Sequence, residues 1–257
     1  MEMILETQEL DTQLIQLLNE DGYIIIKNFF EVDYINQIKE KAFSIFEKQF
    51  EFFGYEGDFT EKMITLFNEH EDIFINCGKI IQTGLIELYQ LSVENKVLSL
   101  IKSLGLDFPN LCTRPVMFFN HPSLAKEEYY YKTPPHQDYP SMESSLDSIV
   151  LWVPLVDVSK KNGSLLIWPK SHKNGVLKYE SVGGFASVNT FGEPIQLNLS
   201  MGDIVIFSTF LVHASGDILD NSIRWSCHFR YTNMSDFDFI QRGFPSPYTY
   251  KPKTKND

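Results

Sequence analysis

The chain has 257 residues, of which 43% are hydrophobic, 14% aromatic and 22% charged. A chain of this length can bury a substantial core, and 21 Phe, 12 Tyr and 3 Trp exclude an intrinsically disordered protein. The formal net charge is −12, whereas nucleic acid and anionic lipid both select cationic surfaces. We therefore expect neither a nucleic-acid partner nor a membrane partner.

Three cysteines, Cys77, Cys112 and Cys227, lie far apart in the sequence. Their odd number and the lack of a Cys-x-x-Cys spacing argue against a disulfide framework and against a structural zinc site. The N-terminal segment lacks the basic and apolar regions of a signal peptide. No window approaches the roughly 18 apolar residues of a membrane span. These features predict a cytoplasmic protein.

The first part of the chain is predicted to be mostly helical. Leucines and isoleucines recur at helical spacing between residues 10 and 18, and Asp21-Gly22 then gives a turn signal. The run 23–27 is short and β-prone, and apolar residues between 35 and 46 mark a second amphipathic helix. Further helical stripes follow between residues 60 and 104.

After Pro109 the pattern changes to short apolar runs separated by Gly, Pro, Asn and Asp turns. The predicted strands lie within 112–120, 148–158, 164–168, 195–199, 203–208 and 224–232. Several short strands at modest spacing are typical of a β-sandwich or barrel. The fold class is therefore predicted to be mainly β with flanking helices (α+β), with the N-terminal helices packed outside the β core.

A single domain is predicted over residues 1–257, because no linker rich in Pro, Gly or Ser divides the chain. Within it we expect a helical part at about 1–105 and a β core at about 110–235. The remainder, about 236–257, is expected to be an extended tail. The sequence does not determine the oligomeric state.

The triplet His136-Gln137-Asp138 is the first candidate for chemistry. It follows Pro134-Pro135, which disfavours a helix just upstream and favours an extended entry. In an extended strand the His136 and Asp138 side chains would point to the same face. They would supply two of the three ligands of a two-His-one-carboxylate facial triad for Fe(II). The triplet alone is weak evidence, because it is frequent by chance.

The second histidine of such a triad must come from a distant strand, and His213 is the best placed. It closes an apolar β segment, where a buried imidazole needs a polar partner or a metal. A core histidine bonded to the backbone is the alternative.

Arg224 follows eleven residues later and Ser226 shares its strand face. An arginine among β-type residues is costly to bury unless it meets an anion, and its fork matches a carboxylate. Arg224 and Ser226 could therefore grip one carboxylate together, although a surface salt bridge is the more common role of an arginine. The ordered set of His-x-Asp, a later His, Arg and Ser is much less frequent by chance than any one part.

These residues resemble the phytanoyl-CoA dioxygenase family of Fe(II)- and 2-oxoglutarate-dependent oxygenases. The resemblance covers almost the whole chain. It rests on 19–27, 136–138, 151–155, 162–165, 169–172 and 202–203, together with His213 and Arg224.

The resemblance implies a double-stranded β-helix, a jelly-roll fold, with Fe(II) held by His136, Asp138 and His213. It further implies 2-oxoglutarate as cosubstrate, with Arg224 holding its distal carboxylate. Trp152 lies where the family often has an aromatic residue beside the cosubstrate, and Met117 is a weaker match.

Two further positions of the resemblance concern structure rather than chemistry. His172 belongs to a Pro-x-Ser-His turn and is expected to be structural. Lys170 stands where the family commonly has Gly, which should alter a loop and leave the chemistry unchanged.

The implied activity is hydroxylation of a small-molecule metabolite with O₂, releasing succinate and CO₂. Asp138 keeps the carboxylate that related halogenases replace with a small residue, which favours hydroxylation over halogenation. The sequence leaves two alternatives open: a cupin-type metal-binding isomerase, and a catalytically silent binding protein on the same scaffold.

Overall fold

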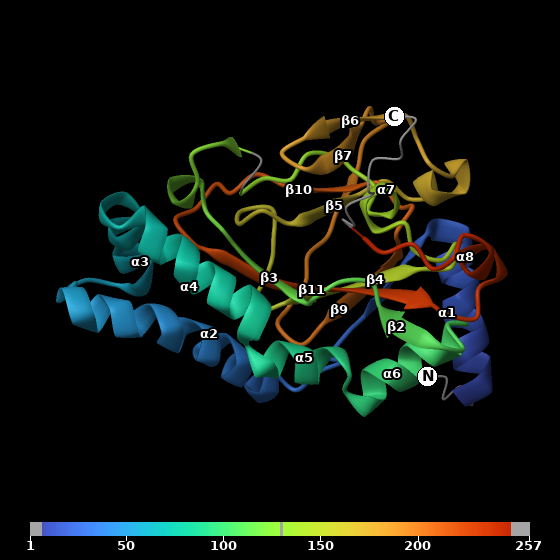
Figure 1. The fold of residues 1–257 in the computed structure, drawn as a ribbon, viewed down its shortest axis with the longest axis horizontal. Helices are drawn as coiled ribbons and strands as arrows, with labels where there is room; N and C mark the ends of the chain where they lie inside the picture. Colours follow the sequence, from blue (N-terminus) through green and yellow to red (C-terminus); the bar gives the residue numbers. More distant parts are fainter. Residues whose placement is uncertain (1–6, 129–130, 248–257) are drawn as a thin grey trace, which may run out of the picture.

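The computed structural model describes residues 7–128 and 131–247, and its β core consists of two facing antiparallel sheets (Figure 1). The larger sheet has the order β1-β9-β4-β11-β2, and β3 also pairs with β11. Its strands are β1 (Tyr23–Ile26), β2 (Pro109–Leu111), β3 (Val116–Asn120), β4 (Ile149–Pro154), β9 (Ile204–Ser208) and β11 (Arg224–Asn233). This arrangement confirms the predicted α+β class with a jelly-roll core.

The smaller sheet has the order β10-β5-β8 and faces the inner side of the larger one. Its strands are β5 (Leu165–Ile167), β8 (Ile195–Gln196) and β10 (His213–Ser215). A separate hairpin, β6 (Tyr179–Val182) and β7 (Phe185–Val188), turns at Gly183-Gly184. An isolated bridge between His136 and Ser187 joins this hairpin to the segment that carries the His-x-Asp triplet.

Most helices of the first part cover the outer face of the larger sheet, below and to the left of it in Figure 1, and the N-terminal helix lies on the right. The helices of the first part are α1 (Thr7–Asp21), α2 (Val32–Phe53), α3 (Phe59–Glu69), α4 (Glu71–Gly84), α5 (Ile86–Ser92) and α6 (Asn95–Ser103). Short helical turns follow at η1 (Pro122–Leu124), α7 (Tyr139–Met142), η3 (Ser171–Asn174) and α8 (Phe237–Gln241). Among the described residues, no helix is long and apolar enough to cross a membrane.

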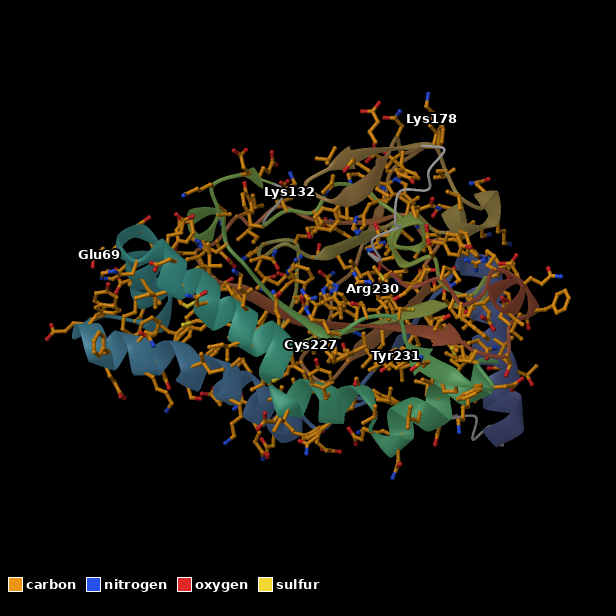
Figure 2. All side chains as sticks on the ribbon, in the orientation of Figure 1. Glu69, Lys132, Lys178, Cys227, Arg230 and Tyr231 are labelled. Atoms are coloured by element: carbon orange, nitrogen blue, oxygen red, sulfur yellow. The ribbon has the colours of Figure 1, made fainter. Side chains whose placement is uncertain are left out.

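The period-two alternation of the central strands separates two cores. In β4, Leu151 and Val153 pack against the helices, whereas Val150 and Trp152 face the smaller sheet. In β11 the residues facing the helices are all apolar or aromatic: Trp225, Cys227, Phe229 and Tyr231. Figure 2 places Cys227 and Tyr231 towards the helices and Arg230 in the interior between the sheets. The inward face of β11 is polar throughout, which is the feature that builds the site.

Two local expectations differ from the structure. Asp138 does not continue an extended strand but has helical dihedrals at the start of α7, with φ −77° and ψ −32°. The segment after residue 236 is not wholly extended, because α8 forms there with the Asp236 side chain accepting a bond from the Phe239 amide. Both differences arise from short capped turns, which carry little periodic signal. Residues 248–257 lie outside the described part of the chain.

The Pro-x-Ser-His turn packs on the junction between α1 and β1. The His172 ring lies so close to Gly22 that a Cβ there would meet it, and Gly22 has φ +85°. His172 Nε2 lies 3.1 Å from the Asn19 carbonyl, a contact that fits a structural role. Lys170 has the left-handed backbone that glycine adopts readily, with φ +67°.

Candidate active site

A pair of backbone hydrogen bonds brings the two candidate histidines together. The His136 amide donates to the His213 carbonyl at 3.0 Å, and the His213 amide donates to the His136 carbonyl at 3.1 Å. Residues paired in this way project to the same face of an antiparallel pair, and the ring centroids lie 4.1 Å apart. The pairing therefore places two imidazoles at one point of the inner face, although 77 positions separate them in the sequence.

Each imidazole is oriented by a carbonyl near its own backbone. His136 Nδ1 lies 2.7 Å from the Pro134 oxygen, and His213 Nδ1 lies 3.0 Å from the Leu211 oxygen. A carbonyl only accepts, so each Nδ1 carries the proton and each Nε2 keeps its lone pair. This is the tautomer that a metal ligand requires.

The Asp138 carboxylate lies opposite the two free nitrogens. Its Oδ1 is 3.9 Å from His136 Nε2, and its Oδ2 is 4.0 Å from His213 Nε2. One ligand atom from each of the three residues lies within 4.8 Å of the others. All three side chains are buried, with residue exposures of 4–5%. Spacing and donor types fit a facial triad for Fe(II) with open positions on the far side.

The backbone around Asp138 is held by several hydrogen bonds. The amides of Asp138 and Tyr139 both donate to the Thr209 carbonyl at 3.0 Å. Gln137 points away from the triad, and its Nε2 donates to the carbonyls of Gly175 and Phe210. Its Oε1 also accepts from the Leu177 amide at 2.9 Å. Gln137 thus fixes the triplet to its surroundings while its two neighbours face the cavity.

Electrostatics keep the carboxylate charged and the imidazoles neutral. Burial, together with the neighbouring His213, lowers the pKa of His136 to about 3. Burial also lowers the pKa of His213. Burial alone would raise the pKa of Asp138, but the Arg230 guanidinium and the two neighbouring histidines together outweigh it, so the pKa lies below its usual value. Neutral imidazoles and an ionised carboxylate are the forms that bind a cation.

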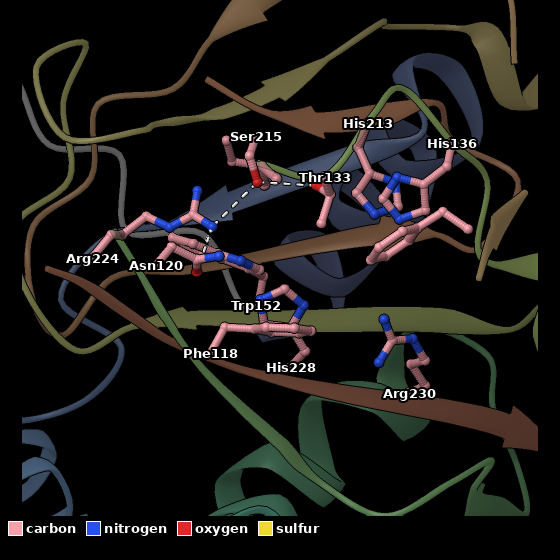
Figure 3. A pocket seen from close by; sticks show the side chains of 12 residues that line it. Phe118, Asn120, Thr133, His136, Trp152, His213, Ser215, Arg224, His228 and Arg230 are labelled. Atoms are coloured by element: carbon pink, nitrogen blue, oxygen red, sulfur yellow. Dashed lines mark hydrogen bonds between the residues drawn. The ribbon is translucent and has the colours of Figure 1, made fainter. Parts of the chain in front are cut away.

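The two histidines of the triad line a small, partly enclosed cavity between the sheets (Figure 3). Its lining residues are Phe118, Asn120, Thr133, His136, Trp152, Leu165, Phe185, His213, Ser215, Arg224, His228 and Arg230. In Figure 3, Arg224 lies at one end of the cavity and the two histidines at the other. The cavity therefore joins a metal-type site to a buried cation.

Arg224 is a buried cation without a carboxylate partner among the residues that the structure describes. The residue is 3% exposed. Its guanidinium donates to the Gly163 carbonyl, to Asn120 Oδ1 at 2.9 Å and to Ser215 Oγ at 3.2 Å. Its Nε is buried with no hydrogen-bond partner, and burial lowers the pKa of the group to about 10. A buried guanidinium whose hydrogen-bond partners are all neutral retains its charge for an anion such as a carboxylate.

The other predicted cosubstrate residues lie in different places. Trp152 lines the cavity on β4, with its ring centroid 6.0 Å from that of His228. Ser226 faces the same side as Arg224, but its hydroxyl lies 3.2 Å from His228 Nε2, and Ser215 bonds the guanidinium instead. Ser215 is therefore the hydroxyl that contacts Arg224 in this structure, and the joint grip by Arg224 and Ser226 stays a prediction.

The expectation for Met117 is corrected. It is fully buried in the core between the larger sheet and the helices, because it lies on the helix-facing side of β3. Its neighbour Phe118 takes the cavity position. A one-residue error of this kind exchanges the two faces of a strand.

Several cavity residues were not expected from the sequence. His228 and Arg230 lie on the inward face of β11 beyond Ser226. The alternation that places Arg224 and Ser226 on one face would have identified them if it had been followed for four more residues. Asn120, Thr133, Ser215 and Phe185 come from other strands and loops, and no local pattern marks them. Their place follows from tertiary pairing alone.

Two lysines that precede the triplet already have acidic partners. Lys126 pairs with Glu71, and Lys132 pairs with Asp217 at 2.6 Å and with Glu128 at 3.3 Å. Tyr129 and Tyr130, which also precede the triplet, lie outside the described residues.

The fold and site together define a jelly-roll protein with a His-Asp-His metal-type site, and comparison with solved structures supports the fold. A non-haem monooxygenase, ThoJ, matches with a TM-score of 0.62 and 15% identity, covering 86% of this chain and 77% of the other. The carbocyclase SnoK of nogalamycin biosynthesis matches with a TM-score of 0.61 and 12% identity, over 96% and 95%. The epimerase SnoN, solved with Fe³⁺, α-ketoglutarate and nogalamycin RO, matches with a TM-score of 0.61 and 16% identity, over 88% and 84%. At these identities the likeness shows the fold.

The chain belongs to the phytanoyl-CoA dioxygenase (PhyH) family, whose model matches residues 18–225. Human peroxisomal phytanoyl-CoA dioxygenase is 24% identical over 239 residues, covering 82% of this chain and 65% of the human protein. The bovine protein is 26% identical over 144 residues, covering 51% of this chain and 42% of its own length. The chain thus spans less than two thirds of either relative.

Proposed function

We propose that this protein is an Fe(II)- and 2-oxoglutarate-dependent oxygenase that hydroxylates a small-molecule metabolite. The observation that carries the proposal is that two histidines of the buried His-Asp-His triad line the same cavity as Arg224, a buried cation without a carboxylate partner among the described residues. A metal site alone would need no buried cation. A dicarboxylate that binds the metal at one end and Arg224 at the other explains why the cavity contains both.

Different residues of the cavity would hold the metal and the cosubstrate. His136, Asp138 and His213 would hold Fe(II), and Arg224 with Ser215 and Asn120 would receive the distal carboxylate. When bound, Fe(II) with 2-oxoglutarate and O₂ supplies the oxidising chemistry, releasing succinate and CO₂ and adding one oxygen atom to a C–H bond.

The protein itself contributes orientation and a dry cavity. Phe118, Trp152 and Leu165 provide apolar walls between the arginine and the triad. Low exposure at the triad limits water at the metal.

The alternative functions make different demands on the same cavity. A cupin-type isomerase or a silent binding protein has no need for a buried guanidinium that only neutral groups contact. The family membership and the intact triad favour an oxygenase. Acyl-CoA, amino acids and sugar-linked metabolites are the substrate classes to be screened, and the cytoplasm is the predicted compartment.

The test is 2-oxoglutarate turnover by the purified protein. With Fe(II), 2-oxoglutarate and O₂, we expect succinate to form slowly without substrate and faster with the correct substrate class. Arg224→Met is the matched negative control, because it removes only the anion site. Absence of succinate under every substrate class, together with Fe(II) binding, would favour the isomerase or binding alternative.

Asp138 makes a prediction about the outcome of the reaction. A carboxylate ligand fills the coordination position that a halide would need, so the unmodified protein should form no chlorinated product even in high chloride. Product mass analysis in chloride buffer checks this expectation. Asp138→Ala should lower Fe(II) affinity sharply, because the site loses its only anionic protein ligand. Full hydroxylase turnover by that variant would instead assign the third ligand to another acid, such as Glu143 or Asp147.

A further inference from the structure

Arg230 is a second buried arginine in the cavity, at the end opposite Arg224. It lies six residues further along the inward face of β11 and is 8% exposed. Its Nε lies 3.0 Å from Asp138 Oδ2, and its Nη2 lies 3.2 Å from Asp138 Oδ1. Both oxygens of the candidate metal-binding carboxylate are therefore engaged by one guanidinium.

We propose that Arg230 is the positioning residue of the metal-binding carboxylate, holding Asp138 with its oxygens towards the two histidine Nε2 atoms. This inference rests on the metal site of the proposed function. It assigns to Arg230 no contact with the reacting atoms. Its effect reaches the metal through Asp138.

The geometry places the carboxylate between the guanidinium and the imidazoles. The same two oxygens that accept from Arg230 lie 3.9 Å from His136 Nε2 and 4.0 Å from His213 Nε2. Rotation of the carboxylate about its terminal bond would break at least one of the two arginine hydrogen bonds. The bidentate contact thus sets the plane in which the carboxylate meets a metal.

The other bonds at Asp138 fix its backbone and leave its carboxylate unguided. The amide donates to Thr209, and the Asp138 carbonyl accepts from the amides of Ser141 and Met142 in the first turn of α7. Arg230, in contrast, extends from a strand paired on both sides: it is in register with Val150 of β4, and its carbonyl accepts from the Cys112 amide at 2.8 Å. A guanidinium on so restrained a strand is a suitable anchor for a ligand.

Position and charge predict opposite effects on metal affinity. The positive charge of Arg230 repels a divalent cation, and its hydrogen bonds compete with the metal for the carboxylate oxygens. If Arg230 acted only in these ways, its removal would tighten metal binding. If it positions the carboxylate, its removal weakens metal binding, because an unguided carboxylate must be ordered when the metal arrives. The sign of the change separates the two roles.

The first experiment is anaerobic Fe(II) titration of the full chain, with unmodified protein, Arg230→Gln and Arg230→Lys. We expect Arg230→Gln to weaken Fe(II) binding about 10- to 100-fold, as loss of partners behind metal ligands does. Arg230→Lys keeps the charge but loses the fork, so we expect an intermediate loss. Arg114→Gln is the matched control, because Arg114 is exposed and does not line the cavity. Unchanged or tighter binding by both Arg230 variants would overturn the inference.

The second experiment removes the Asp138 carboxylate and supplies a carboxylate from solution, as formate, in its place. Asp138→Ala leaves the Arg230 side chain facing the gap, where formate could bind between guanidinium and metal. We expect added formate to increase the Fe(II) affinity of Asp138→Ala at least about 5-fold more than that of Asp138→Ala/Arg230→Gln. The threshold is an order-of-magnitude figure, because the double variant lacks the two charge-assisted hydrogen bonds that Arg230 could make to formate. Equal responses of the two variants, including no response in either, would contradict the inference.

Different results would contradict this inference and the proposed function. If the unmodified protein binds no Fe(II), the proposed function fails. If it binds Fe(II) and the Arg230 variants bind equally well, only the role of Arg230 fails. Thermal unfolding of each variant without metal shows whether the fold is kept. In the formate experiment, the double variant is compared with Asp138→Ala and not with the unmodified protein.

Discussion

Replacing Arg224 by methionine should separate cosubstrate binding from folding. The side chain bonds Asn120 Oδ1, Ser215 Oγ and the Gly163 carbonyl, and has no acidic partner among the described residues. A charge-assisted bidentate pair with a carboxylate contributes about 2–4 kcal/mol when it is partly desolvated. The expected loss of 2-oxoglutarate affinity is therefore about 30- to 1000-fold.

The stability of the ligand-free protein should change much less. Loss of the guanidinium leaves neutral acceptors unpaired, which costs about 1–3 kcal/mol for each buried group. It also removes a buried cation without an acidic partner, which relieves a desolvation cost of several kcal/mol. Because the two effects oppose each other, the free energy of unfolding without ligands should shift by less than about 2 kcal/mol.

The assay is calorimetric titration of 2-oxoglutarate into the Fe(II)-loaded protein under anaerobic conditions, combined with thermal unfolding of both forms. The unmodified protein should gain about 2.7 kcal/mol of stability at 100 times the dissociation constant, and Arg224→Met should gain little at the same concentration. Arg114→Met is the control, because Arg114 is exposed and does not line the cavity. Unchanged 2-oxoglutarate affinity in Arg224→Met, or equal losses in both variants, would refute the reasoning.

Three further predictions concern the same cavity. His136→Ala and His213→Ala should each lose most bound Fe(II), and wild-type metal content in both, measured by elemental analysis, would contradict the site. Ser215→Ala should weaken the binding of 2-oxoglutarate by up to about tenfold, because the Ser215 hydroxyl bonds Arg224. Ser226→Ala should leave that affinity unchanged, because the Ser226 hydroxyl contacts His228. A larger loss in Ser226→Ala than in Ser215→Ala, measured by titration, would identify Ser226 as the contact. Burial lowers the pKa of His136, His213 and His228 in the folded state, so the unfolded chain binds more protons below about pH 6.5. Metal-free stability should then fall as the pH drops below that value, by about 1.4 kcal/mol per pH unit for each histidine, and denaturant unfolding at pH 7, 6 and 5 measures the slope; a flat profile would show that these groups titrate normally.

Local patterns in the sequence predicted the classes of element, and they marked His136, Asp138 and His213, which the structure brings close together. The helical stripes before residue 105 and the short β runs after residue 110 correspond to observed helices and strands. The alternation in β11 already separates Arg224 and Ser226 from the apolar residues between them. These features depend on side-chain periodicity, which is a property of neighbouring residues.

Short turns and strand faces were harder to predict. Asp138 reaches the triad from a helical turn because its amide and that of Tyr139 share one carbonyl, a long-range contact. Met117 and Phe118 differ only in which side of β3 they occupy, and pairing with β11 decides that side. A strand buried on both faces has no polar alternation from which its register could be read.

Only the tertiary structure decided which groups serve the candidate ligands. Arg230 and Asp138 are 92 positions apart, and Arg224 and Asn120 are 104 apart, so no spacing in the sequence relates them. Their meeting depends on strand order and register, because β11 lies between β3 and β4 and carries both arginines on its inward face. The sequence alone determined the chemical inventory of the site. The packing of two sheets determined its pairing, because burial in a shared cavity forces charged groups to find partners across the fold.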